Sequence, residues 1–314
     1  MSPEPTPGAI PEPVLGTMTF GDTVDAETAG RMLDLALEAG VTGVDTANGY
    51  AGGAAEEILG ELLRGRRDRV VLATKAGIPH PDAGGHAPLS PAGLRASLEG
   101  SLRRLRVEHV DLFYLHQPDR ATPLEDTLGT VAELAAEGKI GELGVSNYAA
   151  WQIVGISPRP VVAQQLYNLL ARRIEDEYAE FATSTGLRTM VYNPLGGGLL
   201  TGRHRFDRAP ETGRFGDSRV AAMYRERYWD AELFKAVEAL DVIALDAGVP
   251  LAELSLRWLL DKPVVSSVLL GASSLGHLRA NLAALAAGAL PAEVAAACDT
   301  VGDALRGPMP AYNR

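Results

Sequence analysis

The feature of this sequence that most constrains its fold is an alternation of short apolar runs with longer segments of helical pattern. There are eight such runs, and each is dominated by Val, Leu and Ile with little alternation of polar and apolar residues. This composition is typical of strands that are buried on both faces of a parallel sheet. The predicted strands are 14–20, 42–45, 70–75, 110–116, 140–146, 161–167, 187–192 and 266–271.

The segments between these runs carry the signals of helices. Residues 25–39 place apolar side chains on one face and are followed by Gly40, which suits the left-handed position after a helix. Residues 90–105 begin with Ser90 as the expected N-cap and Pro91 at the first helical position. Further helices are predicted over 123–136, 174–183 and, as the last helix of the chain, 275–285.

Eight strand–helix units over about 260 residues predict a single (β/α)8 TIM barrel with long loops on its C-terminal face. A doubly wound sheet is the alternative, but no G-x-G-x-x-G motif follows the first strand. Residues 1–13 hold five prolines and are expected to form a disordered leader, with the barrel over 14–314. The 37 residues between Tyr192 and Asp230 are too many for a plain connection, which predicts a functional loop.

Composition excludes several classes of function. A formal net charge of −11 argues against nucleic acid or an anionic lipid surface as a partner. The single cysteine cannot close a disulfide within the chain, and the six histidines show no metal-ligand spacing. Since no apolar stretch is long enough to span a membrane and no signal peptide is evident, we expect a cytoplasmic protein without a metal.

Ionisable side chains lie at the ends of three consecutive predicted strands. The second strand ends in Asp45, with Tyr50 five residues later, the third ends in Lys75 and the fourth in His116. Because the carboxyl ends of barrel strands meet at one rim, we expect these four side chains to converge. Each alone has a commoner structural role, such as a turn aspartate or a solvated lysine, but together they favour a catalytic site.

The four residues suit proton donation to a carbonyl oxygen. A tyrosine hydroxyl, with a pKa of about 10, is a poor donor near neutrality. A Lys75 ammonium is expected to lower the pKa of Tyr50, and Asp45 to hold the lysine charged, so that Tyr50 protonates a developing alkoxide. His116 is expected to donate a hydrogen bond to the same oxygen. No side chain supplies a hydride, so a cofactor must do so.

Two further features are candidates for holding that cofactor. Ser146, Asn147 and Gln164 offer hydroxyl and amide groups that suit a carboxamide, and Tyr192 offers an aromatic face for a nicotinamide ring. The glycines at 196–198 allow backbone amides to approach a pyrophosphate. Residues 271–274 open a helix, and a helix N-terminus is an anion site.

Six motifs in order resemble the aldo-keto reductase superfamily. They are GVDTANGY (43–50), ATK (73–75), DLFYLHQPD (111–119), GVSNY (144–148), YNPLGGGLLTG (192–202) and GASSLGHLRANL (271–282). The segments GRF (213–215), MYRERYW (223–229) and the terminal PAYNR are similar in particular to its aflatoxin-aldehyde and succinic-semialdehyde reductase branch. The similarity runs from about Val14 to Arg314.

The resemblance implies an enzyme that reduces aldehydes, and some ketones, to alcohols with NADPH, and a possible homodimer. The implied catalytic residues are Asp45, Tyr50, Lys75 and His116. The implied NADPH or NADP+ site comprises Asp45, Ser146, Asn147, Gln164, Tyr192, Asn193, Pro194, Leu195, Gly196, Gly198, Leu200, Arg203, Arg214, Gly271, Ser273, Ser274, His277 and Asn281. The implied substrate site, suited to carboxylate-bearing aldehydes such as succinic semialdehyde and to dialdehydes, comprises Tyr50, His116, Tyr224, Arg227 and Arg314.

The sequence departs from this branch at a few positions of the expected site, and two other functions are compatible with parts of it. Gly49 stands where the branch carries a bulkier side chain, and Gly276 and His277 replace an acidic residue and a glutamine. One alternative is a nicotinamide-nucleotide-binding regulatory protein with weak catalysis, which the intact set of four residues disfavours. Another is an aldolase with Lys75 as a Schiff-base nucleophile, which is disfavoured because Asp45 keeps the lysine protonated.

Overall fold

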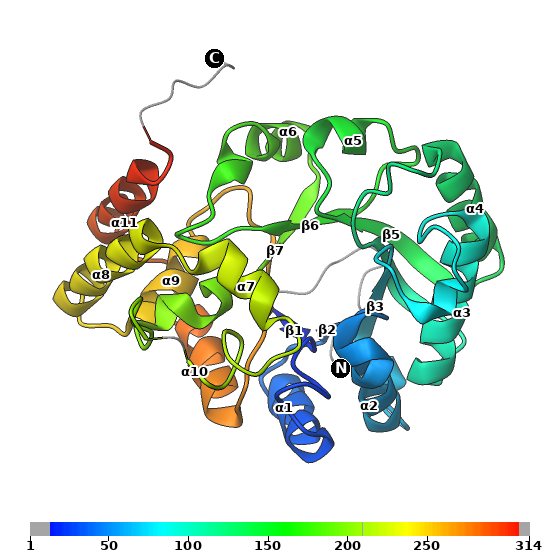
Figure 1. The fold of residues 1–314 in the computed structure, drawn as a ribbon, viewed down its shortest axis with the longest axis horizontal. Coiled ribbons are helices and arrows are strands. Elements are labelled where there is room, and N and C mark those ends of the chain that lie inside the picture. Colours follow the sequence, from blue (N-terminus) through cyan, green and yellow to red (C-terminus); the bar gives the residue numbers. More distant parts are fainter. Residues whose placement is uncertain (1–12, 209, 308–314) are drawn as a thin grey trace.

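Eight parallel strands close into one barrel in the computed structural model, which describes residues 13–208 and 210–307. The strands pair in chain order and β8 pairs back to β1 (Figure 1). They are β1 (Val14–Gly16), β2 (Gly43–Asp45), β3 (Val71–Ala76), β4 (Val110–Leu115), β5 (Ile140–Ser146), β6 (Val162–Leu166), β7 (Arg188–Tyr192) and β8 (Ser267–Leu270). The predicted (β/α)8 barrel is confirmed.

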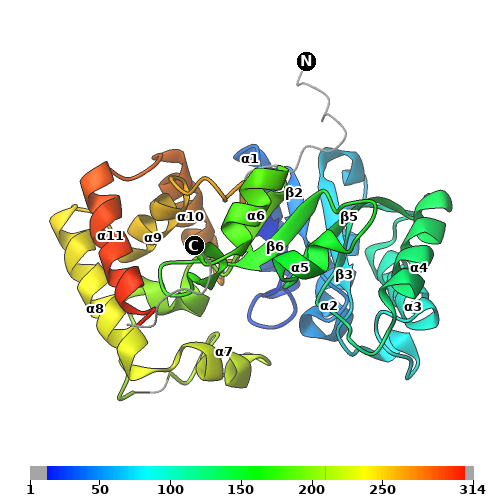
Figure 2. The same cartoon turned by 90° about the horizontal axis from the view of Figure 1, so that it is seen from above.

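Helices surround the barrel on its outside (Figure 1). The α-helices are α1 (Ala26–Glu38), α2 (Ala54–Leu62), α3 (Pro91–Leu105), α4 (Leu124–Ala136), α5 (Ala150–Val154), α6 (Tyr178–Thr185), α7 (Ala221–Tyr228), α8 (Ala231–Asp246), α9 (Leu251–Leu259), α10 (Leu275–Ala286) and α11 (Ala292–Ala304). Short 3-10 turns are η1 (Tyr50–Gly53), η2 (Arg67–Arg69), η3 (Pro81–Ala83), η4 (Arg173–Glu175) and η5 (Gly196–Thr201). Viewed from above, α7 stands apart from α8, α9 and α11 (Figure 2).

The predicted helix boundaries at α1 and α3 are confirmed by their caps. Before α1, Asp25 accepts a hydrogen bond of 2.8 Å from the backbone amide of Thr28, and Gly40 after it has a φ of +81°. Before α3, the Ser90 hydroxyl accepts from the amide of Gly93 at 3.3 Å. Each cap pairs a backbone amide that the helix itself leaves without a partner.

Two predicted boundaries were wrong, and one helix was not predicted. The first strand ends at Gly16 rather than at residue 20, because Thr17 bonds to the Asp45 carbonyl and Phe20 turns back to Thr17. The helix predicted over 174–183 begins only at Tyr178, after the turn η4. The helix predicted as the last of the chain is α10, but α11 follows it and packs beside α8.

The interior of the barrel is filled by side chains of the strands themselves. These buried residues are Val14, Ala73, Leu112, Tyr114, Val162, Met190 and Leu269. Because side chains alternate along a strand, Lys75 faces the same side as Ala73, and Gln164 the same side as Val162. Lys75 and Gln164 are therefore held on an apolar interior layer, where both are almost completely buried.

Two expectations concern the chain as a whole. Within the described residues, no helix is long and apolar enough to cross a membrane. The leader expected over 1–13 lies, apart from Pro13, outside the described residues.

Candidate active site

Backbone hydrogen bonds hold the segment after β2 against β3. The amide of Asn48 donates to the carbonyl of Lys75 at 3.1 Å, and Tyr50 begins the turn η1 two residues later. Ala51, Gly52 and Gly53 then take positive φ values of 50°, 66° and 100° before α2 starts. This tight turn lets the Tyr50 side chain lie beside the Lys75 side chain.

The Lys75 ammonium is the centre of the site. Its Nζ donates to the carbonyl of Thr46 at 2.9 Å and to the Tyr50 hydroxyl at 3.1 Å, and it forms an ion pair with Asp45. The second Asp45 oxygen accepts from the Gln164 amide at 3.0 Å. The Lys75 and Asp45 side chains are both 0% exposed, so the pair is completely desolvated. Three of the four predicted catalytic residues, Asp45, Tyr50 and Lys75, are thus in direct contact through the Lys75 ammonium.

Burial and neighbouring charges shift the pKa values of Lys75 and Asp45 in opposite directions. Burial by itself lowers the pKa of Lys75, but the attraction of Asp45 and Tyr50 prevails and raises it above its usual value. Burial raises the pKa of Asp45, against the pull of the Lys75 charge. Lys75 is therefore held as an ammonium at neutral pH.

The expected lowering of the Tyr50 pKa is not found. Burial is the largest influence and raises the pKa of Tyr50, although the Lys75 charge acts in the predicted direction. The sequence prediction took account of the charge but could not include the loss of solvent. Tyr50 is consequently a protonated phenol across the neutral range, as a proton donor must be.

His116 follows β4 directly and faces Tyr50. The two rings meet edge-on, with centroids 6.0 Å apart and planes at 84°. Burial, helped by the Lys75 charge, lowers the pKa of His116 to about 3, so the ring is neutral at physiological pH. Its Nδ1 is buried with no hydrogen-bond partner among the described residues. A neutral imidazole of this kind can donate one hydrogen bond without adding charge.

The predicted carboxamide site is brought together next to His116. Asn147 has a φ of +63° and donates from Nδ2 to the carbonyl of His116 at 3.0 Å and to the Ser146 hydroxyl at 3.1 Å. The Tyr192 hydroxyl donates to Asn147 Oδ1 at 2.6 Å. Gln164 lies in the middle of β6, and its Nε2 donates to Asp45.

The glycine-rich loop after β7 adopts a conformation that only glycines take easily. Gly197 and Gly198 have φ values of 70° and 104°. A side chain added at Gly198 would lie 3.4 Å from Arg203 Nη2, so the loop exposes bare backbone beside an arginine. The other predicted residues of this loop are Asn193, Pro194, Leu195, Gly196 and Leu200, which precede or form η5. The amides of Gly196, Gly197 and Gly198 donate within the turn itself, so the group that the loop offers to an anion is the Arg203 guanidinium beside it.

The predicted cofactor residues from Gly271 to Asn281 lie before and along the first turns of α10. The Ser274 hydroxyl accepts from the backbone amide of His277 at 3.2 Å, and the Ser273 hydroxyl lies 3.1 Å from His277 Nδ1. Asn281 is buried one turn further along. A Cβ on Gly271 would meet nothing within 4 Å, which leaves open space before this helix.

Two arginines flank Tyr224 on the long loop and α7. The guanidinium carbons of Arg214 and Arg227 lie 5.1 and 5.8 Å from the centroid of the Tyr224 ring. Arg214 Nη1 is buried with no hydrogen-bond partner among the described residues. A buried guanidinium nitrogen without a partner fits an anionic ligand such as a cofactor phosphate. Arg314, also predicted for the substrate site, lies outside the described residues.

Sequence reasoning missed several residues that shape the site. Thr46 binds Lys75 through its carbonyl, which no side-chain pattern reveals. Ile78 fills the space beside Gly49, where a Cβ would lie only 2.4 Å from Ile78 Cδ1. Asn168 and Tyr228 both bind Asn193. The only signal for Asn168 in the sequence was its place directly after a predicted strand, and the only signal for Tyr228 was its place in the motif MYRERYW.

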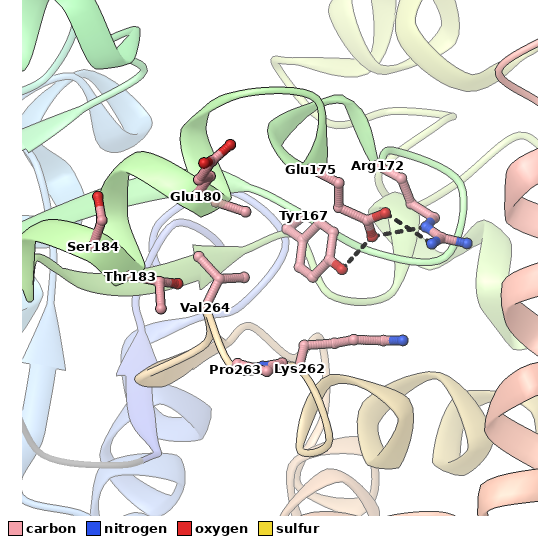
Figure 3. Close-up of a pocket in the computed structure, with 10 residues that line it drawn as sticks. Tyr167, Arg172, Glu175, Glu180, Thr183, Ser184, Lys262, Pro263 and Val264 are labelled. Carbon is pink, nitrogen blue, oxygen red and sulfur yellow. Dashed lines mark hydrogen bonds and ion pairs between the residues drawn. The ribbon is translucent and has the colours of Figure 1, made fainter. Parts of the chain in front are cut away.

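One pocket of about 520 Å³ lies away from these residues, between α6 and the segment that joins α9 to β8. Figure 3 shows Tyr167, Arg172 and Glu175 at one side of it and Lys262 to Val264 at the other. Three of its charged residues have partners, since Arg172 binds Glu175 at 2.8 Å and Lys262 binds Asp299 at 2.8 Å. None of the predicted site residues that the structure describes lines this pocket.

Comparison with known proteins agrees with the geometry. Residues 14–303 match the model of the aldo/keto reductase family. The human aldo-keto reductase family 7 member A3 is 40% identical over 306 residues, covering 90% of this chain and 91% of the relative. The human aflatoxin B1 aldehyde reductase member 2 is 40% identical over 300 residues, covering 88% and 82%. A probable voltage-gated potassium channel subunit beta from rice is 34% identical over 284 residues, covering 85% of each chain.

Proposed function

The chain belongs to the aldo/keto reductase family, and from this premise we propose that it reduces aldehydes to alcohols with NADPH, using Tyr50 as the general acid. The observation that carries the proposal is the buried Lys75 ammonium, which lies 3.1 Å from the Tyr50 hydroxyl and is paired with Asp45. This arrangement supports Tyr50 as the proton donor, because the Lys75 charge compensates the negative charge that proton loss leaves on the Tyr50 oxygen. Its relatives include proteins named as aldehyde reductases.

Two side chains are positioned to hold the carbonyl oxygen of the substrate. Tyr50 donates from its hydroxyl, and His116, which faces the Tyr50 ring, donates from its neutral imidazole. Two donors aimed at one oxygen stabilise the negative charge that develops there. When bound, a nicotinamide supplies the hydride for the carbonyl carbon.

The proton then moves from Tyr50 to the developing alkoxide. Because burial raises the pKa of Tyr50, the phenol keeps its proton until the substrate oxygen becomes strongly basic. The Lys75 ammonium stabilises the phenolate left behind, and Asp45 fixes that ammonium in place. General acid catalysis of this kind contributes about 10²–10⁴-fold to a rate.

We propose that the residues at the ends of β5 and β7, the loop after β7 and the start of α10 hold the cofactor. Ser146 and Asn147 would bind its carboxamide beside Tyr192, and the loop 193–198 its pyrophosphate. Arg214, whose Nη1 has no partner among the described residues, and Ser273 and Ser274 favour the cofactor with the additional phosphate, NADPH, over NADH.

A carboxylate-bearing aldehyde is the proposed substrate class. Arg227 lies beside the Tyr224 ring, and its charge also acts on the Tyr192 hydroxyl. A guanidinium at this position offers a planar pair of donors that matches a carboxylate. Succinic semialdehyde combines the aldehyde with such a carboxylate at the other end of a short chain.

The first experiment titrates the protein with NADPH and NADH while tryptophan fluorescence is followed, and then adds succinic semialdehyde. We expect tighter binding of NADPH and its oxidation on addition of the aldehyde. Tyr50→Phe should bind NADPH normally and lose most turnover. Tyr178→Phe is a matched control, because it also removes a buried tyrosine hydroxyl. That hydroxyl forms a hydrogen bond of 2.9 Å with Thr189 and lies outside the site.

Two results would contradict the proposal. Normal turnover by Tyr50→Phe would exclude Tyr50 as the acid. Tight nucleotide binding without turnover of any aldehyde would favour the regulatory alternative, to which the similarity with a channel subunit also points.

A further inference from the structure

We propose that Asn168, Asn193 and Tyr228 form a coupling cluster, by which the loop 193–198 sets the position of α7 and hence of Tyr224 and Arg227. The cluster would make binding of a carboxylate aldehyde depend on the occupancy of the nucleotide loop. This inference rests on the proposed function, which assigns the loop to the cofactor and α7 to the substrate.

Asn168 is the fixed part of the cluster. It is completely buried after β6, and its Oδ1 accepts from the amides of Leu170 and Ala171 at 2.9 and 3.0 Å. Its Nδ2 donates to the Asn193 carbonyl at 2.9 Å and to the Tyr228 hydroxyl at 3.1 Å. The side chain therefore joins the end of β6 to the nucleotide loop and to α7 at once.

Asn193 is the part that belongs to the nucleotide loop. It has a φ of +60°, and its Oδ1 accepts from the amide of Gly197 at 2.7 Å. Its Nδ2 donates to the Tyr228 hydroxyl at 2.8 Å. Any adjustment of the loop at Gly197 is transmitted through this one side chain to Tyr228.

A second contact joins the same loop to α7. A Cβ on Gly197 would lie only 2.5 Å from Cδ1 of Tyr224, so the tyrosine ring rests directly on the glycine backbone. Tyr224 and Tyr228 are four residues apart and thus lie on one face of the helix. The loop contacts α7 both at the ring of Tyr224 and at the hydroxyl of Tyr228.

Besides these contacts, α7 is held by Arg225, which donates to the carbonyls of Phe215 and Gly216, and by the ring contact of Tyr224 with Phe215. The helix has eight residues, and only Ala221, Tyr224 and Tyr228 are buried. A helix this short is not stable by itself, so its position is decided by its tertiary contacts. Arg227 is carried by the last turn, and its position follows that of Tyr228.

Coupling between two sites is reciprocal. If nucleotide binding orders the loop 193–198 and with it α7, nucleotide must raise the affinity for a ligand held by Arg227, and that ligand must raise the affinity for nucleotide by the same factor. Couplings of this kind are typically about 5–150-fold. Asn168 and Tyr228 are positioning residues in this scheme, since neither is assigned a contact with the substrate.

The test measures hydrogen exchange of residues 221–228 in the wild-type protein with and without NADP+. We expect NADP+ to slow exchange there in the wild type and in the control Tyr178→Phe. Tyr228→Phe, which removes the hydroxyl and keeps the ring, should lose this protection. It should also raise the KM for succinic semialdehyde by at least about fivefold. This change should exceed both the decrease in kcat and the increase in the KM for a neutral aldehyde.

A second variant tests the same contacts in case Tyr228→Phe does not fold. Asn168→Asp keeps the acceptor for Leu170 and Ala171 but sets a carboxylate oxygen against the Asn193 carbonyl, which breaks the bond to the loop, and we expect the same loss of protection. The proposal is overturned if wild-type protein binds NADP+ and reduces the aldehyde while exchange at 221–228 is unchanged. If the wild type binds no nucleotide, the proposed function fails instead.

Discussion

Replacement of Lys75 by methionine separates the structural role of the buried charge pair from its catalytic role. The Lys75 and Asp45 side chains are 0% exposed, so Lys75→Met leaves a buried carboxylate with only the Gln164 amide, at 3.0 Å, as partner. Removal of one member of such a pair costs about 3–5 kcal/mol of unfolding free energy. At about 2 °C per kcal/mol for a chain of this size, the Tm should fall by about 6–10 °C.

The pH dependence of this loss has a definite sign. Without Lys75 only the Gln164 hydrogen bond opposes the burial that raises the pKa of Asp45, and the carboxyl is protonated more readily in the folded than in the unfolded state. A group whose folded-state pKa is raised contributes stability at low pH that is lost as the pH rises. Lys75→Met should therefore be closer to wild-type stability at pH 5 than at pH 8.

The double variant Asp45→Asn/Lys75→Met provides the decisive comparison. It removes the unpaired charge while keeping an oxygen that accepts from Gln164, so most of the stability should return. Turnover should stay about 10²–10⁴-fold below wild type in both variants, because neither stabilises the Tyr50 phenolate. Thermal and urea unfolding measure the first effect, and oxidation of NADPH with an aldehyde measures the second. A single variant as stable as wild type, or a double variant no more stable than the single one, would refute this reasoning.

Three further predictions concern other parts of the site. Because the folded-state pKa of His116 is held at about 3, its contribution to stability is complete above pH 6.5 and is lost as the pH falls, by about 1.4 kcal/mol per pH unit. His116→Gln should reduce this slope in unfolding experiments between pH 7 and 4, and an unchanged slope would contradict the low pKa. Gly197→Ala, at a φ of 70° and 2.5 Å from Tyr224, should weaken NADPH binding measured by fluorescence; wild-type affinity would show that the loop tolerates a side chain. Arg227→Ala should raise the KM for succinic semialdehyde more than for a neutral aldehyde, and equal effects would exclude it as the carboxylate anchor.

The sequence by itself determined the architecture of this protein. Runs of Val, Leu and Ile reflect burial on both faces of a strand, and the caps Asp25 and Ser90 bind amides only three residues away. Such signals are local, and they sufficed to predict eight strands and the rim at which Asp45, Lys75 and His116 converge. The helix α11 was missed because its small residues give little apolar periodicity.

The tertiary structure alone decided what depends on burial and on contacts between distant residues. The direction of the Tyr50 pKa is set by competition between desolvation and the Lys75 charge, and the sequence reports only the charge. Gln164 points to Asp45, which lies 119 residues away in the chain. The Tyr228 hydroxyl receives bonds from Asn168 and Asn193, which precede it by 60 and 35 residues. Periodicity shows which side chains leave water, but which of them then meet, and at what cost in solvation, follows only from closure of the barrel and folding of its loops.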